Sequence, residues 1–223
     1  MSEVLSSDGI RLDLSALRAT ADAVGARLFV DRTQAFGVLA TDYATLAADY
    51  VAFHGYKWLL CPRGTAALIV RPDRADELEP LAPGWKSTAL PHGYFGGSPD
   101  LVARSAMRLD SSPAWFSWIG VCAALNIHAS LDHTQVEEHT TGLAQRFVDT
   151  ARSFGYSSPA YGLPSHIAVL NSPVIPHLPD LLREQGVRAA ATETRLRIGV
   201  HYFNNDDDID RVLDVLSQHR PRT

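Results

Sequence analysis

The 223-residue sequence has no long apolar run and few cysteines or lysines. No apolar run approaches the roughly 18 residues that a membrane-spanning helix needs, so we expect no membrane partner. The first residues, MSEVLSSDG, contain neither a basic nor an apolar region, so no signal peptide is expected. The two cysteines, Cys61 and Cys122, exclude a disulfide framework and a cysteine zinc site. They are typical of a reducing, cytoplasmic compartment.

Positive charge is also scarce. The formal net charge is -5, which argues against nucleic acid or an anionic membrane as a partner. Of the 20 basic residues only Lys57 and Lys86 are lysines. Any chemistry that needs a lysine amine therefore has two candidates.

Short apolar segments alternate with helical patterns in the first part of the chain. The segments 27–31, 49–53 and 65–70 predict buried strands, and 12–25 and 42–48 predict helices. This alternation is typical of an α/β fold with a mostly parallel sheet. In such sheets functional residues gather at the carboxyl ends of the strands.

A Pro- and Gly-rich stretch at 72–99 follows and predicts a long ordered loop, which is usually a functional feature. Beyond it, helical patterns cover 100–110, 113–131 and 133–154. The last part mixes short strands and helices and predicts a small α+β subdomain. Its expected elements are strands at 166–172, 187–191 and 195–202 and helices at 178–186 and 206–219. We therefore expect two domains, residues 1–132 and residues 133–223.

One acid–lysine pair lies at the ends of two predicted strands. Asp31 ends the first strand, and Lys57 follows the next strand, 26 residues later. Adjacent parallel strands joined by a crossover would place both side chains in one crevice. Pyridoxal phosphate needs such a pair, because a lysine holds it as a Schiff base and an acid keeps its pyridine nitrogen protonated. The spacing alone favours an ordinary exposed lysine and a helix-capping aspartate, because a lone Asp–Lys pair is weak evidence.

The surrounding motifs add a family resemblance. They are GYKWLLCPRGTA at 55–66, Gly84-Trp85 and RLDSSPAW at 108–115. With these motifs the sequence resembles the class V aminotransferase family of fold-type I pyridoxal-phosphate enzymes, and most closely its isopenicillin-N-epimerase-like branch. The resemblance runs from Ser6 to Leu216. It implies part of a large cofactor-binding domain, followed by the small subdomain.

The resemblance implies a role for each matching position. Lys57 matches the Schiff-base lysine, and Asp31 matches the acid under the pyridine nitrogen. Gln34 matches the residue that hydrogen-bonds the phenolic oxygen of the cofactor. His54 and Tyr56 match positions that contact its phosphate, although either side chain could instead be part of the core.

Three further positions match the family. Gly97-Ser98-Pro99 is similar to a turn in which the hydroxyl reaches the phosphate of the other subunit, so Ser98, and with it Trp85, is expected to act across a dimer interface. Arg197 matches the residue that binds the substrate carboxylate, which suits a planar guanidinium. A structural ion pair is the alternative for Arg197.

The sequence departs from the family pattern in three ways. Family members carry a segment before the point matched by Ser6, with a glycine-rich phosphate turn and a ring that stacks on the cofactor. We expect that segment to come from another chain, or the protein to be a fragment or non-catalytic. Arg32 replaces a small residue after Asp31 and could enter the ring pocket or point away. Residues 123–223 contain no cysteine, which argues against a cysteine desulfurase that uses its own thiol.

Two hypotheses follow. The first is a pyridoxal-phosphate enzyme that acts on an amino acid through Lys57, of the aminotransferase, epimerase or lyase type, as a homodimer. The second is a truncated or non-catalytic subunit of the same fold that binds cofactor only with a partner chain.

Overall fold

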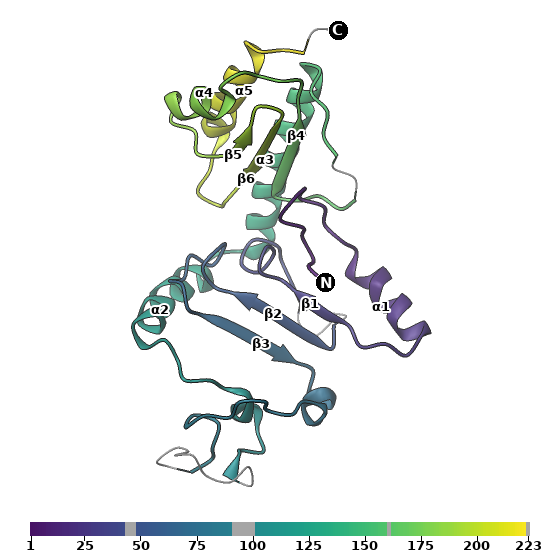
Figure 1. Ribbon diagram of the computed structural model, residues 1–223, viewed down its shortest axis with the longest axis vertical. Helices are drawn as coiled ribbons and strands as arrows, with labels where there is room; N and C mark the ends of the chain where they lie inside the picture. Colours follow the sequence, from purple (N-terminus) through teal and green to yellow (C-terminus); the bar gives the residue numbers. More distant parts are fainter. Residues whose placement is uncertain (43–47, 91–100, 160–161, 222–223) are drawn as a thin grey trace.

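The computed structural model describes residues 1–42, 48–90, 101–159 and 162–221. Within them the chain forms two three-stranded sheets, each at the centre of its own lobe, with helices packed around it (Figure 1). Among the described residues no helix is long and apolar enough to cross a membrane. The α/β class expected from the sequence is confirmed.

The first sheet has the order β1-β2-β3. Its strands are β1 (Phe29–Asp31), β2 (Tyr50–His54) and β3 (Ala66–Val70). The strands β1 and β2 are parallel, as expected, whereas β3 runs antiparallel to β2, so this sheet is mixed. The reason is the connection: the loop between β2 and β3 is too short for the crossover that parallel neighbours need.

The first residues of the chain extend this sheet beyond β1. The backbone N–H of Glu3 donates to the Asp31 carbonyl at 3.0 Å, and that of Asp31 donates to the Met1 carbonyl at 2.7 Å. Ser2 and Asp31 form a parallel bridge. This pairing buries Glu3 and Val4, and the sequence patterns did not predict it.

The second sheet has the order β4-β6-β5 and is antiparallel. Three helices pack around it with a continuous apolar core. These elements are β4 (Ile167–Asn171), β5 (Ala190–Thr192), β6 (Arg195–Gly199), α3 (His133–Ser153), α4 (Leu178–Glu184) and α5 (Asp206–Ser217). All were expected from the sequence to within a few residues.

The start of α5 explains the acidic run at its first turn. Asn205 and Asp208 form a capping box, and Asp206 to Asp208 occupy the end of the helix that favours negative charge. The expectation of a helix N-terminus at this run is therefore confirmed.

Two further helices lie in the first lobe, α1 (Leu14–Ala23) and α2 (Trp115–Ala129). The helix expected at 100–110 is wrong, because the described residues 101–110 contain no α-helix and form a 3-10 turn at Ala106–Leu109. The residues before that turn pair with another strand-like segment instead. Ala103 N–H donates to the Ser87 carbonyl at 2.8 Å. The helix expected at 42–48 lies almost wholly outside the described residues.

A buried ionic network ties the two lobes together. Arg32, only 1% exposed, pairs with Glu3, which also lies 3.8 Å from Arg11. Arg11 pairs in turn with Glu137 of α3, and Glu137 accepts a hydrogen bond from Ala40 N–H at 2.7 Å. The guanidinium of Arg32 is therefore engaged with Glu3, and Arg32 does not enter the cavity described below.

Glu3→Gln tests this network. The substitution leaves the buried Arg32 charge without its counter-ion, so we expect the free energy of unfolding to fall by about 3 kcal/mol. Urea denaturation measures it. The control is Glu79→Gln at an exposed position, which should change little. Equal effects of the two substitutions would contradict the network's role.

Candidate functional site

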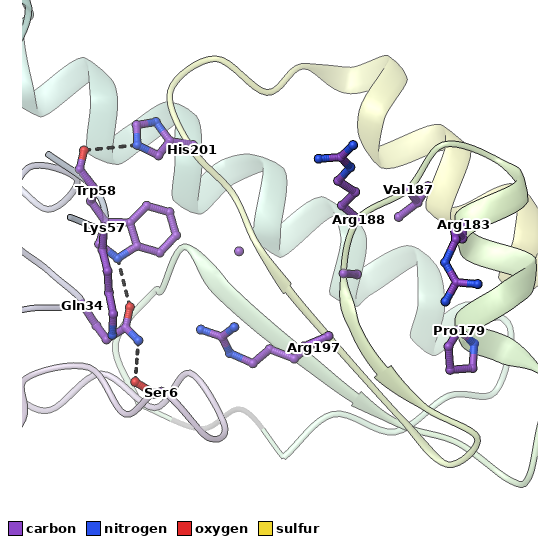
Figure 2. A pocket seen from close by; sticks show the side chains of 13 residues that line it. Ser6, Gln34, Lys57, Trp58, Pro179, Arg183, Val187, Arg188, Arg197 and His201 are labelled. Atoms are coloured by element: carbon purple, nitrogen blue, oxygen red, sulfur yellow. Dashed lines mark hydrogen bonds between the residues drawn. The ribbon is translucent and has the colours of Figure 1, made fainter. Parts of the chain in front are cut away.

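A cavity of about 1060 Å³ lies between the two lobes (Figure 2). One side is formed by the first lobe and the N-terminal segment, and the other by β6 and the chain around α4 and β5. Among the described residues its lining contains no aspartate or glutamate, but four basic side chains: Lys57, Arg183, Arg188 and Arg197. In a chain of net charge -5 this is a local concentration of positive charge, which favours an anionic ligand.

A tight loop after β2 presents Lys57 to this cavity. Gly55 N–H donates to the Thr65 carbonyl at 3.0 Å, and Cys61 N–H donates to the Gly55 carbonyl at 3.0 Å. Only glycine fits at position 55, because a Cβ there would lie 2.8 Å from the Cβ of Cys61. Lys57 is half-buried at this turn and lines the cavity.

Burial and two neighbouring charges set the pKa of Lys57. Burial lowers the pKa of its amine below the usual lysine value, the positive charge of Arg197 lowers it further, and the negative charge of Asp31 raises it. Asp31 ends β1, and its Oδ1 accepts a hydrogen bond from Thr33 N–H at 2.8 Å. The structure thus brings Asp31 within electrostatic reach of Lys57, although Asp31 is not among the residues that line the cavity. The expectation that both side chains share one crevice stays a prediction.

Arg197 enters the cavity from the central strand of the other sheet. In β6 it stands between Val169 of β4 and Ala190 of β5, and its side chain points across the cavity (Figure 2). Its Nε is buried without a hydrogen-bond partner, and no acid among the described residues lies within ion-pair distance of it. Burial lowers its pKa, and the neighbouring Arg195 adds to this. Such a guanidinium has N–H donors available to bind a carboxylate.

Gln34 lines the same cavity and is held by two neighbours. The indole Nε1–H of Trp58 donates to Gln34 Oε1 at 3.0 Å, and Gln34 Nε2 donates to Ser6 Oγ. His201 contacts the carbonyl of Trp58 at 3.1 Å. The sequence motifs did not predict Trp58 and His201 as site residues, although Trp58 directly follows Lys57 in the motif GYKWLLCPRGTA.

His54 and Tyr56 lie beside the lysine loop but do not line the cavity. The side chain of His54 is exposed, so the alternative of a core histidine is wrong. Tyr56 is half-buried, with its ring centroid 5.6 Å from that of His54. Both phosphate contacts stay predictions.

The remaining expected positions lie elsewhere. Trp85 stacks on Trp115 with ring centroids 6.1 Å apart, away from the residues that line the cavity. Lys86 is exposed, with its Nζ 4.6 Å from the Trp85 ring centroid. Ser98 lies outside the described residues. The roles of Ser98 and Trp85 across an interface therefore stay predictions.

Neither cysteine lines the cavity. Cys61 is buried, and burial raises the pKa of its thiol. Cys122 is exposed on α2. No thiol of the described residues is therefore placed to attack a group held at Lys57.

Comparisons with known proteins identify the family and the fold of this chain. The family model of class-V aminotransferases matches residues 1–158. An uncharacterized aminotransferase, YcbU, of Bacillus subtilis is 25% identical over 94% of this chain and 56% of its own length. The isopenicillin N epimerase of Amycolatopsis lactamdurans is 25% identical over 97% of this chain and 58% of its own length. The chain thus spans less than two thirds of these relatives.

Solved structures share the fold. The apo cysteine desulfurase of Thermococcus onnurineus superimposes with a TM-score of 0.82 at 20% identity, over 98% of this chain and 58% of that one. A lysine-to-alanine mutant of C-DES, with glycine covalently linked to its PLP cofactor, gives a TM-score of 0.77 at 24% identity, over 97% and 59%. The fold-type I architecture and the family resemblance expected from the sequence are confirmed.

The two lysines allow the charges around Lys57 to be tested directly. We expect Arg197→Ala to raise the pKa of Lys57, because a neighbouring positive charge is removed, and Asp31→Asn to lower it. The pH dependence of amine acylation, followed at each lysine by peptide mass spectrometry, measures this. Lys86 is the internal control, and its rates should be the same in all variants. Shifts of Lys57 in the opposite directions would contradict the arrangement.

Proposed function

Because this chain belongs to the aminotransferase class V family, we propose that its inter-lobe cavity binds pyridoxal 5'-phosphate and an amino-acid substrate. One observation carries the proposal: Lys57 from the first lobe and Arg197 from the second face the same cavity, which no described acid lines. The lowered pKa of Lys57 increases the fraction of neutral, nucleophilic amine. The buried Nε of Arg197, without a partner, fits an incoming carboxylate.

Lys57 and Gln34 at the cavity, together with Asp31 beside it, fit the aldehyde and pyridine ends of the cofactor. Lys57 would bond to its carbonyl carbon, and Asp31 would accept a hydrogen bond from its ring nitrogen. Gln34 would donate to its phenolic oxygen, because the second N–H of its amide has no protein partner among the described residues. We propose His54 and Tyr56 as phosphate contacts.

The chemistry divides between cofactor and protein. When bound, pyridoxal phosphate supplies an electron sink for charge that develops at the substrate α-carbon. Arg197 would hold the α-carboxylate through two parallel N–H···O bonds and so fix the orientation of the α-carbon. The amine of Lys57, once free, would then move a proton to or from that carbon.

This arrangement serves transamination, epimerisation and elimination alike, since all three begin with proton transfer at the α-carbon. It does not favour desulfuration through a thiol of this chain. Residues 123–223 have no cysteine, Cys61 is buried, and neither Cys61 nor Cys122 lines the cavity.

Reductive trapping tests the proposal. Incubation with pyridoxal phosphate and then borohydride should leave a single reduced adduct on Lys57, because its amine is the more nucleophilic in this setting. Peptide mapping by mass spectrometry locates it. Lys57→Ala should abolish the adduct, and the matched variant Lys86→Ala should retain it. Equal labelling of both lysines, or no adduct on the folded chain, would contradict the proposal.

A second candidate function is favoured by α2. Of its fifteen residues only Val121, Ala124 and His128 are buried, while Phe116 is 90% and Ile119 70% exposed. An apolar helix surface of this kind marks an interaction site. In this reading the chain binds cofactor only together with another polypeptide, either a second copy or a chain equivalent to the remainder of its longer relatives.

Association in solution tests that surface. We expect light scattering to show a concentration-dependent dimer, and the double substitution Phe116→Asp and Ile119→Asp to weaken it by removing apolar contact. The control is Leu81→Asp, at a solitary leucine that is 97% exposed. A strictly monomeric chain, or equal loss of association in the control, would contradict a self-association surface.

A further inference from the structure

Two sets of hydrogen bonds meet at Trp58, the residue after Lys57, one at its backbone carbonyl and one at its indole N–H. The first set starts at the backbone N–H of Tyr202, which donates to Nδ1 of His201 at 2.9 Å. Because a backbone amide can only donate, Nδ1 carries no proton and the Nε2 of a neutral imidazole must carry it. His201 Nε2–H therefore donates to the Trp58 carbonyl at 3.1 Å. Burial holds the pKa of His201 at about 4, so this neutral form persists at pH 7.

The second set fixes the amide of Gln34. An indole N–H is a donor only, so the group that Trp58 Nε1 meets at 3.0 Å must be the oxygen of that amide. The NH₂ group then faces the other way, toward Ser6 Oγ and the cavity. The orientation of Gln34 thus follows from the chemistry of its neighbour.

The indole ring is itself held by the second lobe. Its edge-to-face contact with His166 has a centroid distance of 4.2 Å, and it is stacked with His201 at 5.4 Å. Gly199 leaves room for it, since a Cβ there would lie 3.1 Å from the indole. Trp58, a residue of the first lobe, is therefore clamped by side chains and backbone of the second.

We propose that Trp58 is a positioning residue that orients the Gln34 amide, so that Gln34 presents only an N–H donor to the ligand. The ligand atom opposite Gln34 must then be a hydrogen-bond acceptor, and a hydroxyl that needs an acceptor for its own proton does not fit there. The identity of that acceptor as the phenolic oxygen of pyridoxal phosphate rests on the proposed function. Because Trp58 depends on contacts from both lobes, the donor is set only when the lobes are packed together.

The first experiment needs no cofactor. Hydrogen–deuterium exchange of the four indole N–H groups, followed by ¹⁵N NMR, should show one slowly exchanging signal that disappears in Trp58→Phe. Gln34→Leu should accelerate its exchange at least tenfold, whereas Gln34→Glu keeps the accepting oxygen and should leave it slow. Exchange of the Trp58 N–H as fast as that of Trp118 would overturn the proposal.

The second experiment measures cofactor binding by absorbance. Trp58→Phe should raise the Kd for pyridoxal phosphate roughly tenfold and shift its absorption maximum, because the amide can turn its oxygen toward the ligand. Gln34→Glu, which lacks the donor but keeps the contact with Trp58, should do the same. The matched control is Trp118→Phe, which should bind like the wild type.

The outcomes distinguish the positioning role of Trp58 from the binding of pyridoxal phosphate at Lys57. If the wild type binds and Trp58→Phe binds equally well with an unchanged spectrum, the positioning role falls and the proposed function stands. If the folded wild type forms no adduct at Lys57, the proposed function falls, and the exchange experiment alone decides the orientation of Gln34. If Trp58→Phe fails to fold, the exchange rate of the Trp58 indole N–H in Gln34→Leu and Gln34→Glu decides whether Trp58 holds the Gln34 oxygen.

Discussion

The buried ion pair between Arg32 and Glu3 lies in the network that connects the two lobes, and the site lies between those lobes. Burying two charges costs desolvation free energy, and the contacts on either side offset part of that cost. Glu3 is paired by its backbone to β1, and through Arg11 it reaches Glu137 of the second lobe. The N-terminal segment that contains Glu3 therefore connects the two lobes. Since Lys57 and Arg197 belong to different lobes, their separation depends on this segment.

The cavity follows from the arrangement of the lobes. Its charged lining comes from segments that are distant in sequence, and the pKa of Lys57 reflects both lobes, because burial and Arg197 oppose Asp31. The same is true of Trp58, which is anchored by His201 and packs against Gly199. Packing of the lobes thus sets the protonation of the lysine and the orientation of Gln34 together. A change at the junction should affect both.

Local patterns could predict much of this fold. The apolar runs of β1, β2 and β4 and the acidic start of α5 are encoded within a few residues, and so is the turn that presents Lys57. The direction of β3 follows from the length of its connection to β2, which the pattern of apolar residues does not express. The 100–110 segment has helical periodicity, yet its first residues pair with Ser87 and Thr88, so tertiary pairing overrides local preference.

The site residues divide in the same way. Asp31, Gln34, Lys57 and Arg197 could be predicted because the family motif marks them, and the structure brings Lys57, Gln34 and Arg197 to one cavity. The ion pair of Arg32 could not be predicted in this way. Glu3 lies beside Arg32 only because the N-terminal segment pairs with β1. His201 and Trp58 meet across 143 residues, and no local pattern encodes such a contact.

In the proposed function, the two lobes bring Lys57 and Arg197 to one pyridoxal-phosphate site. A crystal structure of the protein soaked with pyridoxal phosphate tests it most directly. The account predicts continuous density between Lys57 Nζ and the cofactor, the ring nitrogen beside Asp31, and the guanidinium of Arg197 facing the cofactor across open space. Cofactor bound at Lys86 or elsewhere, or a ring nitrogen turned away from Asp31, would contradict it.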